Sequence, residues 1–103
     1  MSDAQVVELH WPADHPAARG HFPGNPIIPG AVVLGEALRR IGEALGQASF
    51  TPRNVRVAKF LHTVRPGDSM AIEFSGGDEV VFTCRVGATV VLKGAAQWSP
   101  APK

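Results

Sequence analysis

The sequence predicts an α+β domain in which a single helix packs against one antiparallel sheet. One stretch, residues 30–45, has the period of an amphipathic helix, and five other stretches have the two-residue period of strands. One helix can bury its apolar stripe only against the remaining elements, so this order favours a helix packed on a sheet. A length of 103 residues fits one domain, 1–103.

The first strand is expected over residues 5–11, where apolar and polar side chains alternate. Residues 12–28 are crowded with Pro, Gly, His and Asp, which predicts a long loop. A long ordered loop in a compact domain is more often functional than not, so this loop is the first place to look for a site.

The helix is expected to begin after Pro29, which presets a helical dihedral at a first helical position. It is expected to end near Leu45, with Gly46 as its C-terminal cap. Its apolar stripe consists of Val33, Leu34, Ala37, Leu38, Ile41 and Leu45.

The rest of the chain is predicted to form four strands joined by turns rich in Gly, Pro and Asp. A change of parity within the first of these strands indicates a β-bulge. The strands are expected at 55–60, 70–74, 80–86 and 90–98, and the turns at 65–68, 76–78 and 87–88.

Composition excludes several classes of protein. A formal net charge of +1 argues against a nucleic-acid binder, and no apolar run approaches the ~20 residues of a membrane span. Cys84 is the one cysteine, so an intrachain disulfide and a multi-cysteine zinc site are excluded. The N-terminus shows no basic leader followed by an apolar stretch, and a cytoplasmic location is expected.

Basic residues are concentrated between the helix and the first turn, where six of them accompany a single acid, Glu43. They form either a solvated face or a docking patch for an acidic partner, because complementary charge speeds encounter. Arg40 belongs to this run, and the docking candidates are Arg39, Arg53, Arg56, Lys59 and Arg65.

The segment HFPGNPIIPG, residues 21–30, is the most informative part of the sequence. Three prolines in seven residues fix the path of the loop that carries His21. The helix begins directly afterwards, so free N–H groups and the positive end of its dipole lie close by. An imidazole can move a proton near neutral pH, and the N–H of Gly30 can polarise a carbonyl as an oxyanion hole does.

HFPGNPIIPG resembles the HFPGxPxxPG signature of the β-hydroxyacyl-acyl carrier protein dehydratases, and RPGDSMAIEF resembles their PVxPGDxLxIE stretch. The resemblance implies a hotdog fold, in which a curled antiparallel sheet of about five strands wraps a long central helix. It also implies dimers or larger oligomers with the active site at the interface, and acyl carrier protein thioesters as substrates. The four histidines have no helical i, i+4 pairing and no nearby cysteines, which argues against a metal site, and no cofactor is expected.

The resemblance implies a role for each matching residue. His21 is the base that removes the C2 proton, and Gly30 offers its N–H to the thioester carbonyl. The residues implied to shape the acyl-binding site are Phe22, Gly24, Pro26, Ile28 and Ala31.

The sequence departs from the family pattern at the acidic residue that protonates the leaving hydroxyl. The family places this acid five positions after the last glycine of the signature, which is Gly35 here, and Glu36 follows one position later. One helical step is a rotation of about 100°. Glu36 is therefore either a shifted catalytic acid or a solvent-facing residue.

Dehydration of a (3R)-3-hydroxyacyl thioester to the trans-2-enoyl thioester is the expected activity. A non-catalytic acyl-binding subunit of a heterodimer and an acyl thioesterase are the alternatives. Loss of the acid at position 35 motivates the first alternative, and the second requires a carboxylate that directs water at the carbonyl.

The other candidate residues have simpler interpretations. His10 is expected to face solvent or an interface, His15 is a surface residue or a second proton carrier, and His62 is a surface residue or part of the tunnel mouth. Cys84 shares parity with apolar residues and is expected to be buried. Trp11 and Trp98 are expected in the core.

Overall fold

The structure, a computed structural model, describes residues 4–15, 26–47 and 51–98. Within these ranges the chain forms one helix and five strands, and the predicted elements are confirmed with ends that shift by at most two residues. They are β1 (Gln5–His10), α1 (Gly30–Ala44), β2 (Asn54–Phe60), β3 (Ser69–Gly76), β4 (Val80–Val86) and β5 (Thr89–Gln97).

The five strands form one antiparallel sheet in the order β1-β3-β4-β5-β2. β1 and β2 are therefore its edges, and β2 pairs with the last strand of the chain. The predicted bulge in β2 is confirmed, because the register shifts between Val55 and Val57. The bulge places Val55, Ala58 and Phe60 on one face of the sheet and Val57 and Lys59 on the other.

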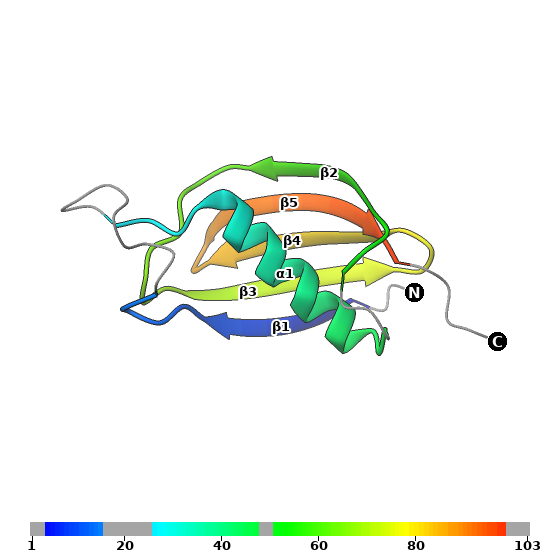
Figure 1. Cartoon of the computed structure of the whole chain (residues 1–103), viewed down its shortest axis with the longest axis horizontal. Helices are drawn as coiled ribbons and strands as arrows, with labels where there is room; N and C mark the ends of the chain where they lie inside the picture. Colours follow the sequence, from blue (N-terminus) through cyan, green and yellow to red (C-terminus); the bar gives the residue numbers. More distant parts are fainter. Residues whose placement is uncertain (1–3, 16–25, 48–50, 99–103) are drawn as a thin grey trace.

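Helix α1 lies across one face of this sheet (Figure 1). Val33, Ala37 and Ile41 are buried on the sheet side of the helix, while Leu34 and Leu45 pack at the margin of the core. Fully burying one aliphatic side chain stabilises a fold by roughly 1.5–3 kcal/mol, so this contact holds the two layers together. The sheet contributes Met70, Ile72, Phe74, Val80, Phe82, Cys84, Leu92 and Ala96 to the same cluster.

The expected ends of the helix are confirmed with one correction. Pro29 is the N-cap residue, with φ −56° and ψ 143°, and not the first helical residue, because its ψ is extended. Gly46 closes the other end as predicted, with φ +72° and its N–H donating to the carbonyl of Glu43 at 3.1 Å.

The turn at residues 65–68 is fixed by hydrogen bonds within the turn and by a reciprocal pair with Trp11, whose N–H donates to the carbonyl of Asp68 at 2.9 Å. The N–H of Asp68 donates to the carbonyl of Arg65, whose own N–H donates to Oδ2 of Asp68. The N–H of Gly67 donates to the carbonyl of Trp11 at 2.7 Å. Trp11 lies just beyond β1, where only 2% of it is exposed, so its predicted place in the core is confirmed. Among the described residues no helix is long and apolar enough to cross a membrane.

Candidate active site

The chain entering α1 is anchored at a defined place beside the sheet. The N–H of Ile28 donates to the carbonyl of Val64 at 2.7 Å, in an isolated antiparallel bridge. This bond ties the end of the signature segment to the chain that follows β2. Pro29 then accepts hydrogen bonds from the N–H groups of Val32 and Val33, which starts the helix.

The first turn of α1 presents its N–H groups without a side-chain cap from the described residues, and it contains no acidic residue. The positive end of the helix dipole is therefore not offset by a nearby carboxylate in that part of the chain. Such a helix end favours a carbonyl oxygen that develops negative charge.

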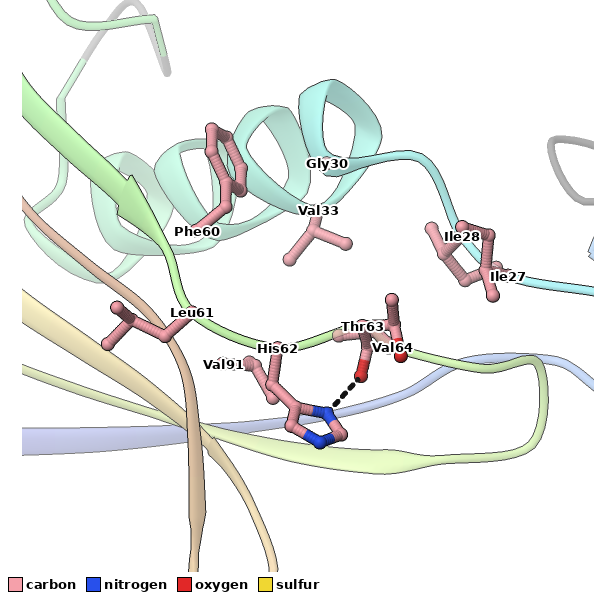
Figure 2. A pocket seen from close by; sticks show the side chains of 10 residues that line it. All are labelled: Ile27, Ile28, Gly30, Val33, Phe60, Leu61, His62, Thr63, Val64 and Val91. Carbon is pink, nitrogen blue, oxygen red and sulfur yellow. Dashed lines mark hydrogen bonds between the residues drawn. The ribbon is translucent and has the colours of Figure 1, made fainter.

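A cavity of about 320 Å³ opens beside this helix end, and Figure 2 shows the side chains around it. Its walls come from the end of the signature segment, the first turn of α1, the last residue of β2, the chain that follows it, and one residue of β5. The lining is mostly apolar, as expected of a site for an acyl chain. The lining residues are Ile27, Ile28, Gly30, Val33, Phe60, Leu61, His62, Thr63, Val64 and Val91.

Phe60 and Gly30 pack against each other at one side of this cavity. A Cβ atom added to Gly30 would lie 3.0 Å from Cδ1 and Cε1 of Phe60. The aromatic ring therefore packs against the helix end because residue 30 has no side chain. Phe60 is still 51% exposed, so the cavity wall that it forms is open to solvent in the single chain.

His62 also lines this cavity, so it lies both at the surface and beside the cavity, and both of its predicted places stay open. It is exposed, and its Nδ1 lies 3.2 Å from the carbonyl oxygen of Thr63. In Figure 2 the imidazole points away from Gly30.

The structure places the other predicted site residues as follows. His21, Phe22 and Gly24 lie outside the described residues. Ile28 and Gly30 line the cavity, whereas Pro26 and Ala31 are exposed and are not among the residues around it.

Gly35 and Glu36 have contrasting surroundings on α1. Gly35 is exposed, and no heavy atom lies within 4 Å of the position that its Cβ would occupy. Glu36 is half-buried and accepts hydrogen bonds from Nη2 of Arg39 at 2.9 Å and from Nε of Arg40 at 3.2 Å. The hydrogen bond from Arg39, and then that from Arg40, lower the pKa of the Glu36 carboxyl against the opposing effect of burial.

The predicted docking residues come from several elements and have different local partners. Arg39 bridges Glu36 and Glu43 along the helix, and Arg56 pairs with Glu79 at 3.0 Å. The remaining three line three separate hollows: Arg53 beside Leu45 and Trp98, Lys59 beside Lys93, and Arg65 beside His62.

The other histidines have local partners. His10 is exposed, as expected, and its Nδ1 lies 3.1 Å from Oγ of Ser69. His15 contacts the ring of Trp11 edge-on, with 5.4 Å between the ring centroids.

Most of the cavity wall was missed by the sequence analysis. Phe60, Leu61, Thr63 and Val91 were assigned no role in a site. One signal in the sequence could have identified part of this wall, namely the change of parity in strand 55–60. That change turns Phe60 towards the helix, and Leu61 follows the end of the strand.

A single helix laid across a five-stranded antiparallel sheet, with an apolar cavity at the helix N-terminus, is the arrangement of the hotdog fold. The comparison with protein families specifies this further. The model of the ApeI-like family, described as ApeI dehydratase, matches residues 1–95, and the chain belongs to this family.

Curated relatives include several 3-hydroxyacyl-[acyl-carrier-protein] dehydratases named FabZ. The protein from Anaplasma phagocytophilum is 35% identical over 92 residues, which cover 76% of this chain and 63% of that protein. The protein from Thermomicrobium roseum is 30% identical over 90 residues, covering 71% of this chain and 60% of that protein. The chain therefore spans less than two thirds of the length of these relatives.

Two solved structures share the fold. The dehydratase heterocomplex ApeI:P from Xenorhabdus doucetiae superposes with a TM-score of 0.77 at 16% identity, covering 91% of this chain and 85% of that chain. An uncharacterized protein from Erwinia carotovora subsp. atroseptica superposes with a TM-score of 0.72 at 21% identity, covering 94% and 83%.

Proposed function

We propose that this protein removes water from a (3R)-3-hydroxyacyl thioester carried by an acyl carrier protein and yields the trans-2-enoyl thioester. The observation that carries the proposal is the apolar cavity at the N-terminus of α1, directly after the segment 21–30. Family membership supports the same chemistry, because the family and its curated relatives are named as dehydratases.

In this proposal the acyl chain occupies the cavity, and the thioester carbonyl accepts a hydrogen bond from the N–H of Gly30. That interaction stabilises the negative charge that develops on the carbonyl oxygen as C2 loses its proton. His21 takes the C2 proton, the electrons of that C–H bond form the C2–C3 double bond, and the C3–O bond breaks. The departing hydroxyl receives a proton as it leaves, so the products are water and the trans-2-enoyl thioester.

That last proton must come from a general acid. A general acid must be protonated when it acts, and the two arginines beside Glu36 favour its charged form. We therefore assign the proton donor to a second subunit across the active site, or to a water molecule that it holds. That the Xenorhabdus neighbour is a dehydratase heterocomplex supports a related subunit as this partner.

Strand β2 is the edge at which we place the second subunit. It lies at the end of the sheet, and every one of its residues except Ala58 is exposed. Val55 and Phe60 are 38% and 51% exposed on the helix side of the sheet. An exposed edge strand with apolar side chains is a template for pairing with another strand. Sedimentation of the parent, alone or mixed with the related subunit, should give a dimer that Val55→Lys does not form. A parent that stays a monomer in both cases would contradict this placement.

The test of the activity is intact mass spectrometry of a panel of 3-hydroxyacyl carrier proteins after incubation with the purified protein. The parent should cause the loss of one water from at least one panel member, and His21→Ala should not. Release of the free acid would identify a thioesterase instead.

A second candidate function is an acyl-binding subunit that has no turnover of its own. The pairing of Glu36 with Arg39 and Arg40, and the glycine at position 35, favour it. The same panel discriminates the two functions. Stable binding of acyl carrier proteins without loss of water would identify the binding subunit.

A further inference from the structure

The segment that carries His21 runs from the end of β1 to the start of α1, and both of its ends are tied to one short stretch of chain, residues 64–68. At the α1 end, the N–H of Ile28 donates to the carbonyl of Val64 at 2.7 Å. Figure 1 shows that the end of β1, the start of α1 and the chain between β2 and β3 lie at the same end of the sheet. We call residues 64–68 the clamp.

The β1 end of the segment is held by a reciprocal pair of hydrogen bonds. The N–H of Trp11 donates to the carbonyl of Asp68 at 2.9 Å, and the carbonyl of Trp11 accepts from the N–H of Gly67 at 2.7 Å. The side chains of Trp11, Ile28 and Val64 are each 2% exposed. The core therefore fixes the contacts at both ends, and the clamp sets the separation between them.

The conformation of the clamp depends on Asp68 and Gly67. Oδ2 of Asp68 accepts a hydrogen bond from the N–H of Arg65 at 2.9 Å, and the N–H of Asp68 donates to the carbonyl of Arg65 at 3.1 Å. Gly67 has φ +93°, a conformation that residues with a Cβ rarely adopt. Neither Asp68 nor Gly67 lines the acyl cavity. A change at either residue therefore alters the clamp and leaves the cavity lining in place.

We propose that Asp68 and Gly67 are positioning residues for catalysis, which set the place of His21 relative to the N–H of Gly30. The base and the oxyanion donor must act on the same thioester, and a misplacement of about 1 Å can lower a rate roughly a hundredfold. Holding both ends of a loop also removes many of the conformations open to it. The role in catalysis rests on the proposed function, whereas the hydrogen bonds of the clamp are independent of it.

The test uses two variants that weaken the clamp and two controls. Gly67→Ala places a Cβ at φ +93°, and Asp68→Ala removes the acceptor of the Arg65 N–H. Gly87→Ala is the matched control, because Gly87 has φ +60° in the turn between β4 and β5. At both glycines no heavy atom lies within 4 Å of the new Cβ. Asp68→Asn is the conservative control, because its amide oxygen can still accept the hydrogen bond.

The first measurement needs no activity. It is the exchange rate of the Trp11 amide hydrogen, normalised to amides in the centre of β4 so that global unfolding cancels. Gly67→Ala and Asp68→Ala should exchange this hydrogen about tenfold faster than the parent, and the two controls should stay within about twofold of it.

The second measurement is the kinetics of dehydration of a small (3R)-3-hydroxyacyl pantetheine thioester, with the related subunit added if one is required. Gly67→Ala and Asp68→Ala should lower kcat at least about tenfold and leave KM within about twofold, because the cavity lining is unchanged. Asp68→Asn should restore most of kcat relative to Asp68→Ala, and Gly87→Ala should keep the parental value. A merely structural role would affect the two glycine variants alike.

Several results would overturn the proposal: parental kcat in Gly67→Ala and Asp68→Ala, equal losses in Gly67→Ala and Gly87→Ala, or a loss confined to KM. An active parent whose Trp11 exchange is unchanged in the clamp variants would show that the clamp proposal alone is wrong. A parent that dehydrates nothing, with faster Trp11 exchange only in the clamp variants, would overturn the proposed function and its catalytic role for the clamp. The anchoring of the segment by the clamp would stand.

Discussion

Replacing Gly35 by glutamate should return a carboxyl group to the position where the dehydratase pattern has one. The structure allows this change without a clash, because no heavy atom lies within 4 Å of the new Cβ. Gly35 is also exposed in the middle of α1, where a glycine weakens the helix. The substitution therefore tests the missing acid in a background that should fold at least as well as the parent.

The expected gain in stability can be worked out from the helix. Replacing an exposed helical glycine by Glu or Gln contributes roughly 0.5–1 kcal/mol. Glutamate at position 35 also stands four residues before Arg39, and such a pair adds about 0.3–0.5 kcal/mol. Gly35→Glu should therefore raise the free energy of unfolding by about 1 kcal/mol, or Tm by roughly 4–8 °C, and Gly35→Gln by somewhat less.

The activity of the two variants should differ much more than their stability. A positioned general acid contributes typically 10²–10⁴ to a rate. Gly35→Glu should therefore dehydrate a 3-hydroxyacyl thioester at least about tenfold faster than the parent. Gly35→Gln has the same length without the acid and should leave the rate unchanged. Equal rates for the two variants, or a Gly35→Glu protein that is less stable than the parent, would refute the reasoning.

Three further predictions concern the framework of the site. In Gly94→Ala the new Cβ would lie 2.5 Å from a backbone oxygen of β2 and 2.6 Å from Cζ of Phe82, so urea unfolding should show a loss of roughly 2–3 kcal/mol, and an unchanged midpoint would contradict this packing. Glu36→Gln should lower the free energy of unfolding by up to about 1 kcal/mol at pH 7. The pairing lowers the pKa of the Glu36 carboxyl, so the stability that the pairing contributes is present above the ordinary pKa of about 4.5 and is lost as pH falls below it. When unfolding is measured at decreasing pH, Glu36→Gln should therefore lose less stability than the parent. Burial raises the pKa of the Cys84 thiol to about 12, so alkylation at pH 8 should be roughly a thousandfold slower in the native protein than in urea, and equal rates would show that the thiol is accessible.

The order of the elements could be predicted because local signals define each of them. The apolar stripe from Val33 to Leu45 identified the helix, and the turns follow from Gly, Pro and Asp at short spacing. The C-terminal cap at Gly46 and the bulge in β2 could also be predicted, because their signals lie in neighbouring residues. One local signal was misplaced, because Pro29 stands before the helix as its N-cap and not within its first turn.

The cavity wall could not be predicted because it depends on long-range pairing. Phe60 forms part of the cavity only because β2 pairs with β5 in one register, and the same register sets Lys59 against Lys93. The basic run, expected to be either a solvated face or a docking patch, is dispersed over the fold for the same reason. Residues that are close in sequence fall on the helix, on an edge strand and in a turn, and Arg39 and Arg56 are already paired with acids.

The central claim is that His21 and the end of α1 act together on the C2 proton of a bound acyl thioester. Its most direct test is the absorbance of the enoyl product formed from a small (3R)-3-hydroxyacyl pantetheine thioester, with the (3S) isomer and His21→Ala as controls. The account predicts product from the (3R) isomer with the parent, supplied with its related subunit if one is required, and none from either control. Equal product from His21→Ala, or none from the parent in either form, would contradict it.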